Sequence, residues 1–324
     1  MKIGVDLGGS HIAIGTIDKD GKIIEKIEKR ITNVEKKDIK FSIESYLIEN
    51  IKEMEKKYKI TEIGIAIPGT ISKDVVIKSV NLGLSDYHII ENLKKEIDLP
   101  IKIRNDAKCA AIAESKYGVL KQYDRSIFLT LGTGIGGAVI INGRLLDTGD
   151  LPGCEFGHII IEENGILCNC GKKGCFEKYA SMKSFKNKLR EELKLDEKTR
   201  GQELLDKIRK NSPENKEYDI ICKTVEDYIK YLSIGISNLI NIFEPEAIGI
   251  GGSFVFFEDV FLNKLIEYIQ GNKLLFNPRE KLIIETAILN NDAGIIGSVL
   301  WDIFNERKIK IWKRKQLEKA MEKH

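Results

Sequence analysis

A histidine and three cysteines in one short stretch of this chain are spaced so that they could hold a metal ion. Cys168, Cys170 and Cys175 follow His158 closely, with glycines between the second and third cysteine. Three thiolates and an imidazole can close a tetrahedral zinc site, in which four protein ligands leave no position for water. The spacing therefore predicts a structural zinc ion, with free cysteines and an unrelated histidine as the alternative.

Two glutamates flank this segment, Glu155 before His158 and Glu177 after Cys175. A zinc ion that fixes the loop would hold both carboxylates in place for a polar ligand. The free ring nitrogen of His158 could donate to the same ligand, because zinc-bound histidines usually donate a hydrogen bond from that nitrogen. Two carboxylates beside a sugar are also typical of a glycosidase, but a glycosidase leaves the glycine-rich loops of this chain without a role.

Asn105 and Asp106 stand where a predicted strand, 99–103, gives way to a predicted helix, 107–117. A carboxylate at a helix N-terminus is favoured as the anion. Asp106 would therefore be ionised near neutral pH and could accept a proton from a reacting hydroxyl group. The alternative is that Asp106 only caps its helix.

Glycine-rich loops follow three predicted strands, in the segments 6–10, 132–137 and 251–253. Without side chains in the way, backbone N–H groups can approach phosphate oxygens, and Asp6 could hold a hydrated Mg²⁺ beside them. The segment 132–137 is not a dinucleotide fingerprint, because a strand and the hairpin turn Asn142-Gly143 follow it where a helix is needed. Two glycine hairpins could grip a polyphosphate, and simple tight turns are the alternative.

Predicted strands and helices cover most of the chain. A unit of strand, glycine loop, strand, turn and strand occurs twice, near 3–27 and 127–146, which indicates an internal duplication. Further strands are predicted near 62–67, 246–250 and 281–287, and helices near 41–57, 181–193, 202–210, 219–243, 258–269 and from about 292. This order predicts an α/β protein.

Composition limits the classes of protein that need to be considered. The chain has 324 residues, enough for two domains, and its net charge of +3 is too small to indicate a nucleic-acid partner. No apolar run reaches membrane-spanning length, and the first strand leaves no room for a signal peptide. Six cysteines, three of them in the glycine-rich cluster, fit a reduced compartment. We therefore expect a cytoplasmic protein that binds neither nucleic acid nor membrane, with the basic segment 308–323 as a solvated helix face.

Four segments together resemble the actin/Hsp70/hexokinase superfamily. Segments 6–10 and 132–137 resemble its two phosphate loops, 251–253 its adenosine loop and 293–297 its closing connector. Within it, Glu155-Phe156-Gly157-His158, followed by Cys-x-Cys-Gly-x-x-Gly-Cys and Glu177, resembles the ROK family of bacterial sugar kinases and repressors. This resemblance covers the whole chain. It implies a two-domain α/β fold of the actin-like, ribonuclease H-like type with ATP and sugar in a cleft between the domains. The small domain would span 1–118 plus about 296–324, and the large domain, with the zinc loop, 119–295.

The resemblance also implies roles for individual residues. Asp106 matches the catalytic base, which accepts the proton of a sugar hydroxyl, most simply the 6-OH, as it attacks the γ-phosphate of ATP. The implied sugar-binding residues are Gly69, Asn81, Asn105, Asp106, Glu155, His158 and Glu177. The implied nucleotide-binding residues are Asp6, Gly8, Gly9, Ser10, His11, Gly132, Thr133, Gly134, Gly136, Gly251 and Gly252. The implied metal ligands are His158, Cys168, Cys170 and Cys175 for zinc, and Asp6 for magnesium.

Departures from the family pattern leave the sugar open. Ser10-His11 stands where many members have Thr-Lys or Thr-Asn, and Gly83-Leu84-Ser85 stands where many kinases have Pro-Gly-Trp. Glucose, N-acetylmannosamine, N-acetylglucosamine, fructose and allose are all substrates of relatives with the same pattern. Repressors of the family carry an N-terminal DNA-binding segment that this sequence does not show, so a kinase is favoured over a sugar-sensing regulator. A chaperone-like or cytoskeletal ATPase would leave the Asn105-Asp106 pair unexplained. Family analogy further implies a homodimer.

Overall fold

The computed structural model describes residues 1–9, 11–31, 38–80, 82–146, 153–278 and 281–300. Ser10, Asn81 and the basic segment 308–323 lie outside the described residues. The chain forms two compact units. Unit 1 contains Met1–Lys121, Ile140–Gly153 and the described part of Leu289–His324, and unit 2 contains Gln122–Val139 and Cys154–Ile288. Unit 1 is therefore assembled from three separate stretches of chain, and the domain boundaries given by the sequence stay a prediction.

Unit 1 is built on a five-stranded sheet with the order β3-β2-β1-β4-β8. Its strands are β1 (Lys2–Leu7), β2 (His11–Ile17), β3 (Ile23–Arg30), β4 (Glu62–Ile67) and β8 (Ile101–Asn105). β1, β4 and β8 are parallel, whereas β2 pairs antiparallel with both β1 and β3. β1, β2 and β4 are buried along most of their length, as near-continuous apolar runs predict for strands covered on both faces.

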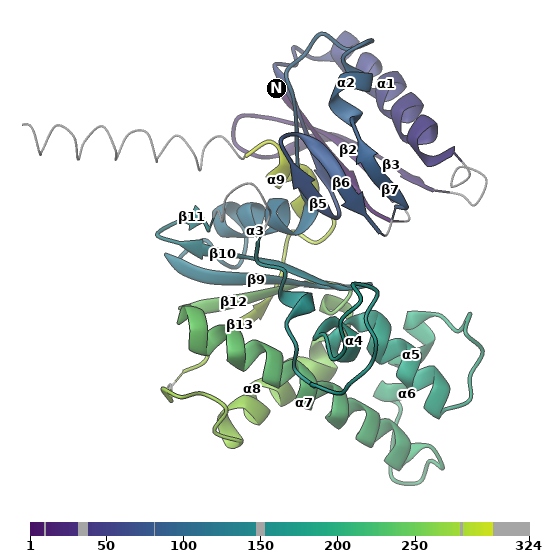
Figure 1. Ribbon diagram of the computed structural model, residues 1–324, viewed down its shortest axis with the longest axis vertical. Helices are drawn as coiled ribbons and strands as arrows, with labels where there is room; N and C mark the ends of the chain where they lie inside the picture. Colours follow the sequence, from purple (N-terminus) through teal and green to yellow (C-terminus); the bar gives the residue numbers. More distant parts are fainter. Residues whose placement is uncertain (10, 32–37, 81, 147–152, 279–280, 301–324) are drawn as a thin grey trace, which may run out of the picture. The chain divides into compact units, whose positions relative to one another are not determined.

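Helix α1 (Ile39–Lys57) lies beside the strands of this sheet (Figure 1), and it packs on them through one apolar face. Its buried residues Ile43, Leu47, Ile51 and Met54 recur every three or four positions, which places them on one side of the helix. They belong to the same hydrophobic core as the strands. The apolar periodicity therefore predicted this helix correctly.

A small three-stranded sheet with the order β5-β6-β7 was not predicted from the sequence. It consists of β5 (Thr70–Ser72), β6 (Val75–Ser79) and β7 (Leu84–Tyr87), and the short helix α2 (Ile89–Leu93) follows. Most residues of these strands are partly or fully exposed. Strands this short and this exposed carry too few apolar residues to show a period of two.

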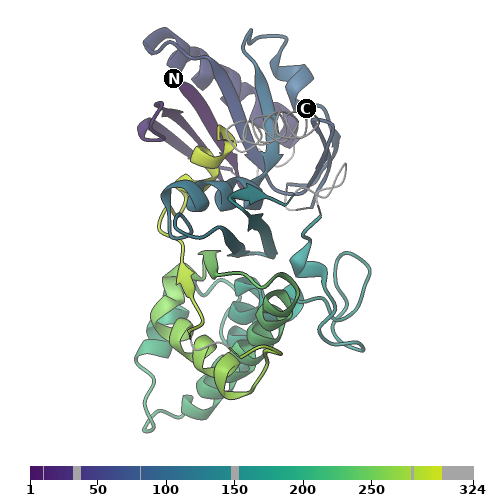
Figure 2. The same ribbon diagram turned by 90° about the vertical axis from the view of Figure 1, so that its left-hand side faces the viewer.

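Helix α9 (Asp292–Ser298) completes the core of unit 1 from the far end of the chain. Glycines allow it to lie directly on its neighbours. A Cβ atom at Gly4 of β1 or Gly64 of β4 would clash with the backbone of α9, and one at Gly297 would clash with the carbonyl oxygen of Cys109. Cys109 belongs to helix α3 (Asp106–Tyr117). Figures 1 and 2 both show α9, in yellow, against the strands of unit 1 and close to α3.

The second five-stranded sheet has the order β11-β10-β9-β12-β13. Its strands are β9 (Arg125–Leu131), β10 (Ile135–Ile141), β11 (Arg144–Leu145), β12 (Ala247–Gly252) and β13 (Ile284–Thr286). β9, β12 and β13 are parallel. Both sheets thus place three successive strands beside two later parallel strands, which confirms the internal duplication that the sequence predicts.

The helices of unit 2 gather beside its strands (Figure 1). They are α4 (Glu177–Ala180), α5 (Met182–Glu192), α6 (Gly201–Arg209), α7 (Tyr218–Phe243) and α8 (Glu258–Gly271). Rings from three of them form an aromatic core, in which Phe185 of α5 lies 4.9 Å from Tyr228 of α7 and 5.0 Å from Phe261 of α8 between centroids. The predicted helices of this region are confirmed. None of the helices within the described ranges is long and apolar enough to cross a membrane.

The glycine segment 132–137 is shorter as a loop than predicted. Only Gly132–Gly134 separates the strands, because β10 already begins at Ile135 and contains Gly136. Glycine has no side chain, so a glycine-rich strand end shows no apolar alternation in the sequence. The turn at Asn142-Gly143 is confirmed: both residues have positive φ, 53° and 64°, as a two-residue hairpin turn of this type requires.

Candidate active site and metal centre

The four predicted zinc ligands come together in unit 2. The ligand atoms of His158, Cys168, Cys170 and Cys175 all lie within 4.8 Å of one another. Cys168 Sγ is 3.7 Å from His158 Nδ1, and Cys170 Sγ is 3.5 Å from Cys175 Sγ. Ligand atoms about 2.1–2.3 Å from a tetrahedral zinc ion are separated by roughly 3.5–3.8 Å. The residues therefore fit a zinc ion in number, chemical type and spacing.

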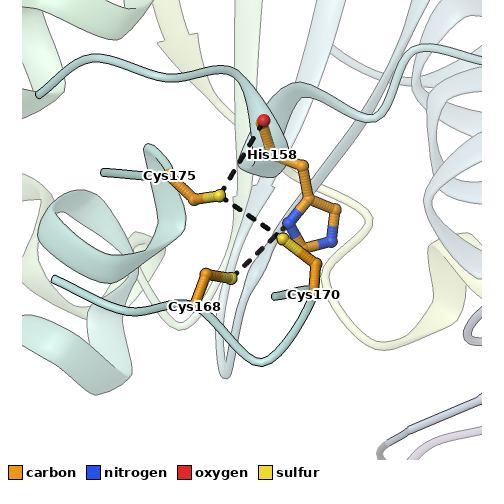
Figure 3. Close-up of side chains that lie close together, drawn as sticks. All are labelled: His158, Cys168, Cys170 and Cys175. Atoms are coloured by element: carbon orange, nitrogen blue, oxygen red, sulfur yellow. Dashed lines mark hydrogen bonds between the residues drawn. The ribbon is translucent and has the colours of Figure 1, made fainter. Parts of the chain in front are cut away.

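Backbone hydrogen bonds hold this ligand set in a compact loop. Cys168 N donates to the carbonyl oxygen of Lys172 at 2.8 Å, and Gly171 N donates to the carbonyl oxygen of Cys168 at 2.9 Å. Gly171 turns the chain with a φ of 89°, which favours glycine. The four side chains point toward one another (Figure 3), and the ring of His158 turns Nδ1 toward the cysteines and Nε2 away from them.

The two predicted sugar-binding glutamates differ in their relation to this centre. Glu177 opens α4, and its Oε1 lies 3.2 Å from Cys168 Sγ and 3.8 Å from His158 Nδ1. Glu155 is exposed and precedes the single 3₁₀ turn Phe156–His158, where its carbonyl oxygen accepts from His158 N at 3.0 Å. Glu177 is therefore fixed against the metal ligands, whereas Glu155 is linked to them through the backbone.

Three predicted site positions of unit 1 lie at the carboxyl ends of neighbouring parallel strands. Asp6 is near the end of β1, Gly69 follows β4, and Asn105 ends β8. Asn105 Nδ2 donates to the carbonyl oxygen of Gly69 at 3.1 Å, and Asn105 Oδ1 accepts from Lys108 N at 3.1 Å. This edge is where α/β sheets usually bind their ligands. The Asn105 side chain thus joins two strand ends and caps α3.

Asp106 and Asp6 are close enough to influence one another's charge. Burial, together with the negative charge of Asp106, raises the pKa of Asp6 to about 7, while Lys26 acts in the opposite direction. Asp106 is the first residue of α3, and its Oδ1 accepts from Ala107 N at 2.8 Å. The helix N-terminus favours the Asp106 carboxylate as an anion. A pair of carboxylates in this position is suited to a divalent cation and to proton transfer.

Sequence reasoning missed two neighbours of Asp6. Lys26 of β3 forms ion pairs with Glu28 at 2.5 Å and with Asp292 of α9 at 2.6 Å. A Cβ atom at Gly294, also in α9, would lie 2.6 Å from Cγ of Asp6. The strand pairing explains the position of Lys26, because Ala13 of β2 is the register partner of both Asp6 in β1 and Glu28 in β3. Neither Lys26 nor α9 is close enough to Asp6 in sequence for local spacing to reveal these contacts.

The first glycine loop closes through its own backbone. Gly8 N donates to the carbonyl oxygen of His11 at 2.9 Å. A Cβ atom at Gly8 would lie 2.5 Å from Cε1 of His11, so the imidazole ring covers this glycine. Gly9 lies between them in sequence, and Ser10 is outside the described residues. His11 is therefore held at the predicted phosphate loop.

The second and third glycine loops lie side by side in unit 2. Gly252 of β12 pairs with Leu131 of β9, so the loop that begins at Gly132 and the segment Gly251-Gly252 share one edge of the sheet. Gly252 has a φ of 74°. A Cβ atom at Gly132 would have no neighbour within 4 Å. Gly132 and Thr133 thus form an open backbone loop of the kind that can approach a phosphate group.

The chain is similar to known proteins along almost its whole length. The family model of the ROK family matches residues 2–303. The chain belongs to the ROK family. This ROK protein is 31% identical over 334 residues to the glucokinase of Thermotoga maritima, a match that covers 94% of this chain and 97% of the glucokinase. It is also 28% identical over 269 residues to the xylose repressor of Bacillus subtilis, covering 81% of this chain and 67% of the repressor.

A solved structure agrees with this assignment. The ROK hexokinase from Thermus thermophilus has a TM-score of 0.74 and 26% identity to this ROK protein, over 93% of this chain and 97% of that chain. The resemblance to the ROK family and the α/β fold of the actin-like type are therefore confirmed.

Proposed function

We propose that this ROK protein is an ATP-dependent hexose kinase that phosphorylates a sugar hydroxyl group, most simply the 6-OH of glucose or of an N-acetylhexosamine such as N-acetylmannosamine. The observation that carries the proposal is the placement of Asp106 beside Asp6 at the carboxyl ends of parallel strands. The similarity to a glucokinase over almost the whole of both chains supports it. Phosphoryl transfer requires this combination of a base near the nucleophile and charge neutralisation at the phosphates.

Asp106 acts as the general base in this proposal. Its carboxylate accepts the proton of the sugar hydroxyl while the hydroxyl oxygen bonds to the γ-phosphorus of ATP and the bond to the β–γ bridging oxygen breaks, which releases ADP. Its position at the N-terminus of α3 favours the anionic form that a base requires. A positioned base of this kind contributes roughly 10²- to 10⁴-fold to a rate.

MgATP binds through the glycine loops and Asp6 in this proposal. Backbone N–H groups of Gly9, Thr133 and Gly134 are suited to phosphate oxygens, while the N–H groups of Gly8 and Gly132 close the two loops by donating to the carbonyl oxygens of His11 and Gly134. Asp6 would hold hydrated magnesium, which prefers one or two carboxylates together with phosphate oxygens. Gly251 and Gly252 at the end of β12, with Gly136, Ser10 and His11, complete the proposed nucleotide contacts.

The sugar-binding residues in this proposal are those that the family pattern implies: Gly69, Asn81, Asn105, Asp106, Glu155, His158 and Glu177. Zinc bound to His158, Cys168, Cys170 and Cys175 would have a structural function, since it fixes the loop that carries two of these residues. With Nδ1 facing the cysteines, Nε2 of His158 remains to bind a hydroxyl group.

A coupled assay of ADP release tests the function. The purified full chain is incubated with MgATP and, in turn, glucose, N-acetylmannosamine, N-acetylglucosamine, fructose and allose. We expect sugar-dependent ADP release with at least one of them, and mass spectrometry of the product identifies the phosphorylated hexose. ADP release that is the same with and without every sugar would contradict the proposal.

The similarity to the xylose repressor favours a second candidate function. A sugar-sensing regulator would bind a sugar without consuming ATP. Calorimetry with the same sugars separates the two candidates, because a regulator gives a binding signal for a sugar that produces no ADP.

A further inference from the structure

Lys186 of α5 is a half-buried cation whose position the proposed sugar and metal sites do not explain. Its Nζ lies 3.3 Å from the hydroxyl oxygen of Ser253 and 5.8 Å from the centre of the Phe257 ring. Within the described ranges of the chain, no carboxylate forms an ion pair with it. The half-buried ammonium group therefore has one neutral acceptor, whereas lysines withdrawn from water are normally paired with an anion.

This position is costly for a positive charge. Burial lowers the pKa of Lys186, and the guanidinium group of Arg190, one turn further along α5, lowers it further. Arg190 is itself occupied by the carbonyl oxygen of Thr199 and by Asn187. An ammonium group has three donors, so two remain available on Lys186 after the contact with Ser253. An anionic ligand would offset the cost and use these donors.

The surroundings of Lys186 indicate which class of anion could bind to it. Helix α5 begins at the second glycine loop, where Lys183 N donates to the carbonyl oxygen of Gly132 at 3.0 Å. Lys186 follows one turn later, and Ser253 directly follows Gly251-Gly252 at the end of β12. Since β9 and β12 are neighbouring parallel strands, the ammonium group lies near the strand edge that carries both glycine loops of unit 2.

We propose that Lys186 binds the phosphate chain of the nucleotide from the side of α5. The proposal rests on the kinase function proposed above and extends it by a residue that no glycine motif contains. Lysine binds phosphate as a compact point charge, whereas a ribose hydroxyl or a base edge would leave the half-buried charge uncompensated. The contact with Ser253 holds the ammonium group in position beside the loops.

The test compares Lys186→Met with Lys188→Met. Methionine keeps the length and apolar stem of the lysine but removes the charge, and Lys188 is an exposed lysine of the same helix that pairs with Glu192 at 2.7 Å. Calorimetry measures the Kd for ATP, ADP, adenosine and the sugar substrate, and thermal unfolding is measured without ligand. Lys186→Arg, which keeps the charge, is the third variant, and Lys186→Gln replaces Lys186→Met if the methionine variant does not fold.

We expect Lys186→Met to raise the Kd for ATP and ADP at least tenfold. The Kd for adenosine and for the sugar should stay within twofold of the unmodified protein, and the unliganded Tm should be equal or higher, because an uncompensated charge has been removed. Lys186→Arg should lose less affinity for ATP and ADP than Lys186→Met does. Lys188→Met should have the same Kd values and the same Tm as the unmodified protein.

Two results with Lys186→Met would overturn the inference. One is an unchanged Kd for ATP. The other is a loss of affinity for adenosine as large as that for ATP, which would indicate a contact to the nucleoside or a purely structural role. Failure of the kinase function itself gives a different pattern, because the unmodified protein would then bind no ATP. If the unmodified protein binds ATP and phosphorylates a sugar while Lys186→Met binds ATP equally well, only the role of Lys186 is wrong.

Discussion

The carboxylate of Glu177 lies against the backbone of Gly134: a Cβ atom at residue 134 would be 2.7 Å from Glu177 Oε2. The other oxygen of the same carboxylate faces Cys168 and His158. One side chain therefore connects the metal centre with the proposed phosphate loop. A ligand that moves Glu177 would affect both.

Gly134→Ala tests this connection. The added methyl group should displace the Glu177 carboxylate and raise the KM for sugar on the order of tenfold, which corresponds to about 1.4 kcal/mol, the scale of one hydrogen bond to a charged group. Steady-state kinetics with varied sugar measures the change. Gly132→Ala is the matched control, since its methyl group would meet nothing within 4 Å. An equal rise in the sugar KM for both variants would show that Glu177 is not responsible.

Asp106→Asn should lower kcat by roughly 10²- to 10⁴-fold, because the amide cannot accept the hydroxyl proton. The sugar Kd from calorimetry should change little, since asparagine keeps the size of the side chain and one of its two acceptor oxygens. The exposed Asp98 serves as a control for the same substitution. Full turnover by Asp106→Asn would exclude Asp106 as the base.

Cys170→Ser should remove most of the bound zinc and weaken sugar binding. Cys170 is the exposed member of the four ligands, so its replacement disturbs little packing besides the metal. Elemental analysis measures the zinc content, and calorimetry measures the sugar Kd before and after treatment with a chelator. Cys222→Ser, a thiol of α7 outside the cluster, should leave both unchanged. Zinc-free protein that binds sugar with unchanged affinity would refute the structural role of the metal.

Asp6 should make the unliganded protein less stable as the pH rises. Its pKa is raised from 3.8 to about 7, because burial and Asp106 oppose its charge. The folded state keeps this proton where the unfolded state has lost it, so the stabilisation is complete below pH about 4 and is lost as the pH rises toward 7. The slope is at most about 1.4 kcal/mol per pH unit.

Urea unfolding at several pH values, without nucleotide or Mg²⁺, measures this effect as the difference between the unmodified protein and Asp6→Asn. Taking the difference removes the contributions of the other titratable groups. We expect the stability of the unmodified protein to fall relative to Asp6→Asn between pH 4 and 7. If the free energies of unfolding of the two proteins changed in parallel with pH, the pKa of Asp6 would not be raised in the folded state.

Gly297→Ala should destabilise unit 1 by about 1–3 kcal/mol, the usual cost of overpacking a core. Its methyl group would clash with the carbonyl oxygen of Cys109, which belongs to the backbone of α3 and cannot turn aside. Gly271→Ala, in the last turn of α8, provides the opposite control: nothing lies within 4 Å of its methyl group, and alanine favours a helix over glycine. Thermal unfolding of both variants should therefore shift in opposite directions.

The parts of the site that the sequence predicted depend on local spacing. His158 and the three cysteines are close in the chain, so their types and intervals were enough to predict the cluster. Asn105-Asp106 was readable because a strand ends and a helix begins at the pair. The role of Lys186 could not be predicted from the sequence, because its contacts with Ser253 and Phe257 join elements far apart in sequence. A lysine on a helix usually faces solvent.

The fold shows the same division. Long apolar strands and the amphipathic helix α1 were predicted correctly, because the pattern of their apolar residues can be recognised within one short stretch of sequence. The sheet β5-β6-β7 and the true start of β10 were missed, since short exposed strands and glycines give no such period. The contact of α9 with Asp6 depends on glycines in β1, β4 and α9 that only the packed chain brings together.

The three separate stretches of unit 1 impose an order on its synthesis. The ribosome completes α3 at Tyr117 but produces α9, which begins at Asp292, only after all of unit 2 has been made. At roughly 5–20 residues per second this interval is on the order of ten to thirty seconds. During that time the face of β1 and β4 that carries Gly4 and Gly64 has no covering helix. A nascent chain of this protein therefore presents an unfinished first half to chaperones and proteases after the whole of unit 2 has been synthesised.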